Sequence, residues 1–111
     1  MDTGQLVVVS CSGPREKFWG VLLALTPVGA TARVVPLEAF EDFLRQFRDG
    51  GQMLIAPVTV FLPAHRLERL ELDESGGAVE GLGDRFCRLT GRNPLEVLLG
   101  KADQGSAEPR M

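Results

Sequence analysis

Short runs of apolar and β-branched residues, separated by glycine and proline turns, dominate the beginning of this chain. Residues 6–11, 18–25 and 31–35 form three such runs. The segments between them contain Gly13-Pro14 and Thr26-Pro27-Val28-Gly29, which have the composition of tight turns. β-Branched residues favour strands because their side chains pack well on a pleated surface. The pattern therefore predicts a meander of three short strands.

The period of the apolar residues changes after Pro36, which ends the third run. Between residues 37 and 48, apolar side chains recur at helical spacing and charged side chains occupy the opposite face. Acidic residues precede the last arginine, an order that suits the helix dipole, and two glycines then stop the helix. We expect an amphipathic helix over residues 37–48, inserted between the third and fourth strands. Its apolar stripe consists of Leu37, Phe40, Phe43, Leu44 and Phe47.

Two further strands are expected at residues 58–62 and 67–72, joined by a turn of 3₁₀ helix at residues 63–66. Residues 53–55 are apolar and extended in character, but Pro57 separates them from the fourth strand. The sequence therefore predicts five strands in all.

The fifth of these strands has an irregular apolar pattern. Leu70 and Leu72 can share one face of a regular strand, whereas Leu67 cannot share that face. We expect the chain to enter this strand through the preceding turn, with Glu71 and Asp73 directed outward.

The domain organisation follows from these elements, with residues 1–74 as the main β domain. Residues 75–81 are rich in glycine and predict a flexible linker. Residues 82–100 predict two short helices as a C-terminal appendage; Asn93-Pro94 is a strong start signal for the second helix. Residues 101–111 are small and polar, which predicts a disordered tail.

The composition limits what the chain can bind. It has 111 residues, 44% hydrophobic and 24% charged, which is typical of one globular domain. A domain of this size is marginally stable alone, so association with a second copy is favoured. The formal net charge is −3, whereas proteins that bind the phosphates of nucleic acids usually have more basic than acidic residues. A broad phosphate-binding surface is therefore disfavoured, although a local basic patch is not.

Targeting signals and cysteine usage point to the cytoplasm. The first four residues, Met1-Asp2-Thr3-Gly4, contain one acidic and no basic side chain, so we expect no signal peptide. The longest apolar run, residues 21–25, is far shorter than the roughly 20 residues that span a bilayer. Cys11 and Cys87 lie outside any Cys-x-x-Cys motif, which predicts reduced thiols. We expect a cytoplasmic protein without membrane contact.

Two segments resemble the Sm-like family, the Lsm and bacterial RNA-chaperone proteins. Val7-Val8-Val9, Gly13 and the run Phe18-Trp19-Gly20-Val21-Leu22 resemble the family's first motif. Residues 60–67 resemble its fourth strand, 3₁₀ turn and fifth strand, and the resemblance covers residues 6–73. It implies a mainly β fold, a five-stranded SH3/Sm-like small barrel with helical additions. It also implies that Gly20 permits a strong bend in the second strand.

The positions at which that family binds RNA differ in this chain. Thr26 stands where the family has an aspartate, and Gly29-Ala30 where it has an asparagine after a hydrophobic residue. Of the bacterial branch's Tyr-Lys-His run only His65 is kept, behind Pro63 and Ala64. The helix that precedes the family's barrel is also missing. The resemblance therefore supports the fold more than RNA binding.

No constellation of residues indicates catalysis, a metal or a cofactor. His65 is the only histidine, so no histidine cluster can bind a metal. Ser10 and Ser12 lie outside a nucleophile elbow. The paired glycines lack the Lys-Ser or Lys-Thr that completes a phosphate loop. We predict that the protein is not an enzyme and uses no cofactor.

Two groups of residues are candidates for binding. His65, Arg66 and Arg69 could contact an anion or nucleic acid; alternatively, His65 is a turn residue bonded to backbone. An exposed aromatic surface could bind a partner protein; alternatively, the same side chains pack in the core. Its members are Trp19, Phe40, Phe43 and Phe47.

A third group is basic. Arg85, Arg88 and Arg92 form a stripe along the expected C-terminal helix. The stripe is either a solvated face or a contact with the acidic region 68–74 of a neighbouring copy.

We predict a non-catalytic interaction or scaffold module that forms homo-oligomers. Small barrels expose edge strands, and pairing of those edges between copies satisfies their backbone groups. A partner protein is a further expectation. The alternative is an Sm-like RNA-binding protein with an atypical binding site.

Overall fold

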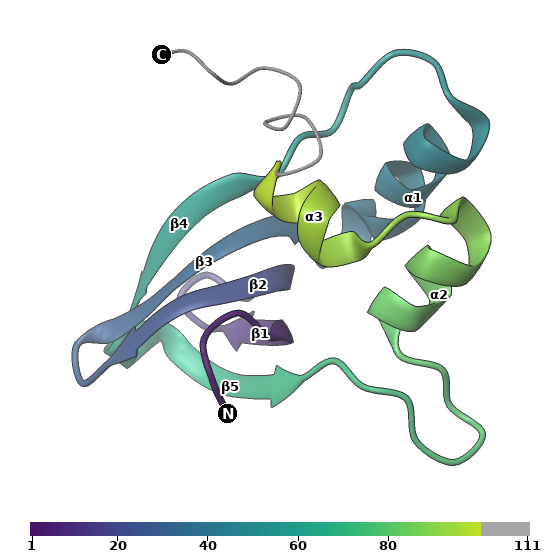
Figure 1. Ribbon diagram of the computed structural model, residues 1–111. Coiled ribbons are helices and arrows are strands. Elements are labelled where there is room, and N and C mark those ends of the chain that lie inside the picture. The colour runs from purple at the N-terminus through teal and green to yellow at the C-terminus, as the bar shows by residue number, and fades with distance from the viewer. Residues whose placement is uncertain (101–111) are drawn as a thin grey trace, which may run out of the picture.

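Five strands form one antiparallel sheet in the order β4-β3-β2-β1-β5 (Figure 1). The computed structural model describes residues 1–100, so the predicted disordered tail lies outside the described residues. The strands are β1 (Leu6–Cys11), β2 (Glu16–Thr26), β3 (Gly29–Pro36), β4 (Val58–Pro63) and β5 (Leu67–Leu72). The prediction of a mainly β fold with five strands and helical additions is confirmed.

The sheet is strongly curled. A 3₁₀ turn, η2 (Ala64–Arg66), connects β4 directly to β5, although these strands are the two edges of the sheet. Four Cα-to-Cα steps from Pro63 to Leu67 reach about 14 Å at most. The edges of a flat five-stranded sheet would lie about 19 Å apart. The sheet therefore curls until its edges approach at this corner. Since β4 and β5 do not pair with each other, the sheet stays open and a closed barrel is not formed.

The inner face of the curl holds one hydrophobic cluster, to which all five strands contribute. We call it the inner cluster. Its buried members are Val7, Val9, Cys11, Leu22, Ala30 and Leu62, with Phe18, Val60, Leu67, Leu70 and Leu72 packed around them.

A second cluster lies between the opposite face of the sheet and the helices. The helical elements are η1 (Leu37–Ala39), α1 (Phe40–Asp49), α2 (Leu82–Thr90) and α3 (Pro94–Leu99). They gather at one end of the sheet, and the β2–β3 hairpin projects from the other end (Figure 1). This helix-side cluster consists of Trp19, Val21, Val35, Phe40, Phe43, Leu44, Phe86 and Leu98. Trp19 packs edge-on against Phe40 at a ring distance of 4.9 Å, a favourable aromatic geometry.

A β-bulge explains the irregular apolar pattern of β5. Cys11 pairs with Leu67 and Ser10 pairs with Arg69, so Glu68 is an extra residue in β5. Because of this extra residue, Leu67 and Leu70 point to the same face of the sheet, and both pack against the inner cluster. The expectation that Leu67 cannot share a face with Leu70 is therefore wrong, because it assumed an unbroken pleat.

The side chain of Asp73 turns toward the helices rather than outward. Its Oδ2 accepts hydrogen bonds from the indole nitrogen of Trp19 at 2.8 Å and from the backbone nitrogen of Gly83 at 2.6 Å. Its Oδ1 accepts from the backbone nitrogen of Leu82 at 2.7 Å. Asp73 thus satisfies free amides at the start of α2, a need that the strand alternation does not show. The expected outward direction holds for Glu71, which is exposed.

The connection between α1 and β4 has no strand, although residues 53–55 are apolar. The side chain of Gln46 satisfies its backbone instead: Oε1 accepts from the amides of Leu54 and Ile55 at 2.8 and 2.6 Å. The Nε2 atom of Gln46 donates to the carbonyl oxygen of Ile55 at 2.9 Å. The 3₁₀ turn η1 directly precedes α1, and neither Pro36 nor Ala39 supplies a side-chain cap.

The glycine-rich segment 75–81 folds back on itself. Gly76 and Val79 exchange two backbone hydrogen bonds of 2.9 Å. The hydroxyl group of Ser75 accepts a 2.8 Å hydrogen bond from the amide of Gly81 and also bonds Asp84 of α2. The segment is therefore a closed loop tied to the helix that follows it.

Candidate binding surfaces

The three residues proposed to contact an anion have different surroundings. The guanidinium group of Arg66 donates to the carbonyl oxygens of Ser12 and Pro14 at 2.9 and 2.8 Å, and it pairs with Glu16 at 2.8 Å. Arg66 therefore fastens η2 to the β1–β2 turn through the N–H groups of its Nε and Nη2 atoms. His65 is exposed on the same short turn.

Arg69 belongs to another surface. Its side chain is 71% exposed and lies 3.3 Å from Glu71. In the sheet register Arg69 stands opposite Ser10, and Ser10 stands opposite Lys17. Opposite residues of antiparallel strands point to the same face, so these three side chains form a row across the sheet.

The aromatic residues proposed as partner contacts pack in the helix-side cluster. Trp19 and Phe43 have no exposed surface, and Phe40 is 3% exposed. Phe47 is partly buried, with its ring 5.1 Å from that of Phe43. The sequence left two alternatives for these side chains, an exposed binding surface or packing in the core, and they pack in the core.

The arginine stripe of the C-terminal helix makes contacts within the chain. Arg85 forms a bidentate ion pair with Glu41 of α1, in which one of the two N···O distances is 3.0 Å. The guanidinium group lowers the pKa of the Glu41 carboxyl. Arg88 pairs with Glu80 through two contacts of 2.8 Å, and Arg92 lies over the ring of Phe47 at 5.1 Å. Arg85 and Arg88 therefore link α2 to Glu41 and Glu80 of the same chain, and Arg92, which follows α2, contacts α1.

Two adjoining hollows share Arg15 and Lys17, and we call this region the Arg15–Lys17 surface. The first hollow has a volume of 370 Å³ and is lined by Arg15, Glu16, Lys17, Leu37 and Glu38. The second has a volume of 440 Å³ and is lined by Ser10, Arg15, Lys17, Glu68 and Arg69.

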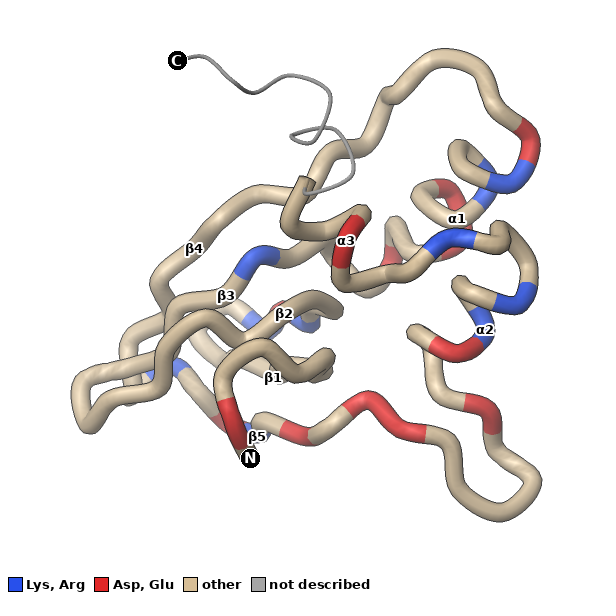
Figure 2. Tube along the Cα trace, in the orientation of Figure 1, with Lys and Arg blue, Asp and Glu red and all other residues tan. Residues whose placement is uncertain are grey.

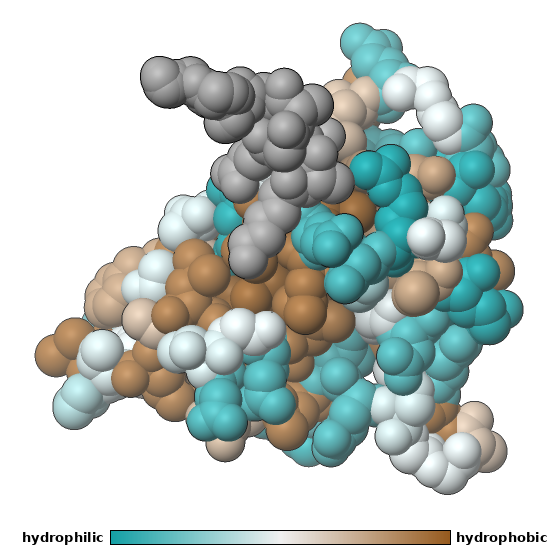
Figure 3. Space-filling model, in the orientation of Figure 1, coloured by the Kyte–Doolittle hydropathy of each residue, from teal (hydrophilic) through white to brown (hydrophobic). Residues whose placement is uncertain are grey.

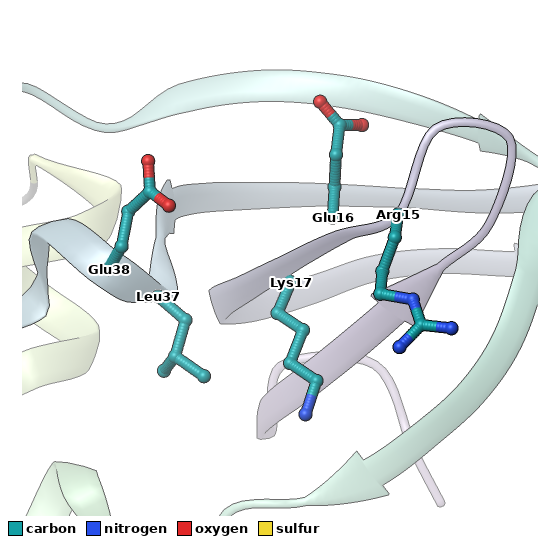
Figure 4. A pocket seen from close by; sticks show the side chains of 5 residues that line it. All are labelled: Arg15, Glu16, Lys17, Leu37 and Glu38. Atoms are coloured by element: carbon teal, nitrogen blue, oxygen red, sulfur yellow. The ribbon is translucent and has the colours of Figure 1, made fainter.

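Figure 4 shows how the charges of the first hollow are arranged. The cationic ends of Arg15 and Lys17 point to the same side as the methyl groups of Leu37. The carboxylates of Glu16 and Glu38 point to the other side. One side of the hollow is therefore basic with an apolar element, which suits an anion that carries an apolar group.

Arg15 and Lys17 were not among the binding residues predicted from the sequence. Each is a single basic residue in or beside the first turn, and neither belongs to a motif. The signal that could have found Lys17 is strand alternation, which puts it on the face of Trp19 and opposite Ser10. Its approach to Arg69 requires the β1–β5 pairing, which joins distant parts of the chain.

The outer edge of β4 is a second candidate surface. Val58–Pro63 contains no charged side chain, and Val58 and Phe61 are 50% and 53% exposed. Figure 2 shows that β4 and the neighbouring tip of the β2–β3 hairpin carry no charge, whereas charges are frequent along the helices. The opposite edge, β5, carries Glu68, Arg69 and Glu71.

The hairpin tip extends the apolar character of β4. Leu25 and Val28 are 49% and 69% exposed, and Figure 3 shows hydrophobic residues reaching from the projecting hairpin toward the centre of the visible face. The ring of Phe61 covers Gly29, since a Cβ atom there would lie 2.7 Å from the ring. Phe61 thus joins β4 to the hairpin surface.

Residues 1–100 lack two further kinds of feature. No group of three or more histidine, cysteine, aspartate or glutamate side chains there could hold a metal ion. No helix within this range is long and apolar enough to cross a membrane.

Comparison with protein-family models, curated proteins and solved structures yields no match for this chain. The Sm-like resemblance therefore rests on residues 6–22 and 60–67 alone.

Proposed function

We propose that the chain is a non-catalytic interaction module that self-associates through its free strand edges. The observation that carries the proposal is the β4 edge, which is apolar, uncharged and half exposed at Val58 and Phe61. An edge strand presents unpaired N–H and C=O groups that pair readily with another strand. Proteins commonly protect such edges with charge, and β4 lacks this protection.

The distribution of charge between the two edges supports the same proposal. Charged residues occupy half of β5, where Arg69 and Glu71 pair with each other. A strand of this kind resists unspecific pairing because its charges would lose water on contact. The contrast makes β4 the edge suited to association.

Sedimentation equilibrium over a wide range of protein concentration tests the proposal. We expect a defined oligomer whose stability does not fall as salt is raised, because apolar and backbone contacts are little screened. Phe61→Lys should shift the protein to monomers by placing charge on the edge. Val79→Lys is the matched control, since Val79 is 72% exposed in the loop before α2 and should keep the oligomer. A strict monomer at all concentrations would contradict the proposal.

The Arg15–Lys17 surface favours a second candidate function, an Sm-like RNA-binding protein with an atypical site. Its basic side chains line both hollows, and Ser10 adds a hydroxyl group to the second. These residues differ from Thr26, Gly29-Ala30 and His65, which stand at the positions where the resembled family binds RNA. A phosphate near Arg15 and Lys17 would be held by charge, so binding would weaken as salt rises.

Titration of labelled single-stranded RNA at low and high salt tests this second candidate. Arg15→Gln with Lys17→Gln should remove the binding seen at low salt. Arg45→Gln with Arg48→Gln is the control, because it removes the same charge from the exposed face of α1. Absence of RNA binding by the unaltered protein at low salt would exclude this function.

A further inference from the structure

We propose that two copies pair β4 against β4 in antiparallel fashion, about a two-fold axis at Val60. The inference rests on the proposed self-association and names its interface. The two curled sheets would join into one continuous sheet. Four features of β4 carry the inference, namely its free backbone groups, its flanking prolines, its side-chain faces and its lack of charge.

The alternation of backbone hydrogen bonds between β3 and β4 shows which N–H and C=O groups of β4 have no partner on β3. Gly29 pairs with Pro63, and the amide of Ala64 donates to the carbonyl oxygen of Val28 at 2.8 Å. Since hydrogen-bonded and non-hydrogen-bonded pairs alternate, Val60 turns its N–H and C=O toward β3. Thr59 and Phe61 turn theirs outward, where the described residues offer them no partner.

Two prolines bracket this free stretch symmetrically. Pro57 and Pro63 lie three positions before and after Val60. Proline has no N–H to donate to a ladder, so it is confined to the ends or free edges of strands. Pairing Val60 with the same residue of the second copy places each proline opposite the other, outside the ladder. A shift of two residues would bring a proline into the ladder.

The side chains match in the same register. Val58, Val60 and Leu62 lie on the inner face of the sheet, and Val58 would stand opposite Leu62 of the second copy. The inner cluster would therefore continue across the junction. A shift of one residue would set inner-face against outer-face positions and break this continuity.

On the other face, the half-exposed ring of Phe61 would cover Thr59 of the second copy. Thr59 lies on this face because its hydroxyl group accepts a 3.2 Å hydrogen bond from Arg33, its ladder partner. Thr59 and Phe61 are also the residues with free backbone groups. They would exchange both hydrogen bonds with their counterparts, on each side of the axis.

The charge pattern favours β4 over β5 as the partner strand. Pairing β4 with β5 of another copy would set Glu68, Arg69 and Glu71 against a strand without any charge. Desolvation of these side chains would then have no compensating partner on β4. Two β4 strands have no charge to desolvate, and an interface of identical surfaces closes as a dimer.

Disulfide cross-linking tests the register. In the Cys87→Ser background the remaining native thiol, Cys11, is fully buried. A cysteine at position 60 would face its counterpart in a non-hydrogen-bonded pair, whose Cα atoms lie about 4.5 Å apart. This spacing suits a disulfide. We expect mild oxidation to convert most of the Val60→Cys variant into a covalent dimer.

Two cysteine variants serve as controls. Thr59→Cys keeps the cysteine on β4, but position 59 would stand opposite Phe61 of the second copy rather than opposite the other cysteine. This variant should therefore cross-link poorly. Glu71→Cys places it on the outer face of β5 and should stay uncross-linked. Equal cross-linking of Val60→Cys and Thr59→Cys would overturn the register.

Mass measurements separate this inference from the proposed function. The unaltered protein should have twice the mass of one chain in sedimentation equilibrium. A larger assembly, or cross-linking only in a mixture of Val60→Cys and Glu71→Cys chains, would overturn the β4–β4 interface and leave self-association in place. A monomer at every concentration would overturn both.

Discussion

The indole nitrogen of Trp19 donates a 2.8 Å hydrogen bond to Oδ2 of Asp73, and this bond joins β2 to the residue that follows β5. Trp19 is fully buried at the centre of the helix-side cluster, whereas Asp73 directly follows the last strand. The same carboxylate also binds the first amides of α2. One side chain therefore fixes the chain direction after β5 and the position of the buried tryptophan.

Asp73→Ala should lower the free energy of unfolding by roughly 1–3 kcal/mol, because it leaves the Trp19 N–H and the α2 amides without their acceptor. Chemical denaturation followed by tryptophan fluorescence measures the change. The neighbouring Glu74 is exposed, and Glu74→Ala should stay within about 0.5 kcal/mol of the unaltered protein. Equal stability of the two variants would show that the Asp73 contacts contribute nothing.

Gly20→Ala should destabilise the sheet at the close approach of β2 and β3. A Cβ atom at Gly20 would lie 2.0 Å from the carbonyl oxygen of Arg33 and 2.7 Å from the Cα atom of Val34. Both are backbone atoms, so no side-chain rotation relieves the clash, and overpacking of this kind costs roughly 1–3 kcal/mol. Gly76→Ala is the control, since no atom lies within 4 Å of the added methyl group. Thermal unfolding of both variants makes the comparison.

Glu41→Gln should reduce stability at neutral pH and have little effect in acid. The hydrogen-bonded Arg85 lowers the pKa of Glu41, so the pair stabilises the fold above the unfolded-chain pKa of about 4.3. That contribution disappears as pH falls through the lower folded-state pKa. Because the Glu41 side chain is 54% exposed, the loss at neutral pH should be only about 0.2–1 kcal/mol.

Urea unfolding at pH 7 and at pH 3 measures this difference. Glu38→Gln is the control, because the exposed Glu38 has no ion pair among the described residues. A Glu41→Gln effect of the same size at both pH values would mean that the loss does not arise from the ionised pair.

The two cysteines should differ in reactivity toward a thiol reagent such as Ellman's reagent. Cys87 is exposed and should react at once in the folded protein. Cys11 is fully buried, and burial raises the pKa of its thiol, so little thiolate forms and the reagent has no access. Cys11 should therefore react only after a denaturant is added. Rapid reaction of Cys11 in a Cys87→Ser variant would show that the inner cluster opens readily.

Local chemistry made the secondary structure predictable. The β-branched run of β1 and the Asn93-Pro94 start of α3 are read from adjacent residues, and the structure has both elements. The Asn93 side chain accepts a 2.9 Å hydrogen bond from the amide of Leu95, as an N-cap does. Features of this kind depend on a few neighbouring residues, so they can be predicted from the sequence alone.

The open sheet and the candidate surfaces depend on pairing between distant residues. The bulge at Glu68 arises from the β1–β5 pairing, and the Lys17–Ser10–Arg69 row arises from the same pairing. The partner of Arg85 lies on another helix. The sequence shows the bulge only as an irregular apolar pattern, and it does not show that Arg69 and Lys17 share a surface, because that requires the pairing of β1 with β5.

The pairing of the first strand with the last has a consequence for synthesis of the chain. β1 is made first, but Val7 acquires its neighbour Leu72 only after all the other strands have been translated. Until then the inner cluster stays uncovered along one side, and the apolar run Leu6–Cys11 has one vacant flank. Contacts between such distant residues slow folding. We therefore expect a nascent chain of this protein to expose an unpaired apolar strand until β5 emerges and completes the sheet.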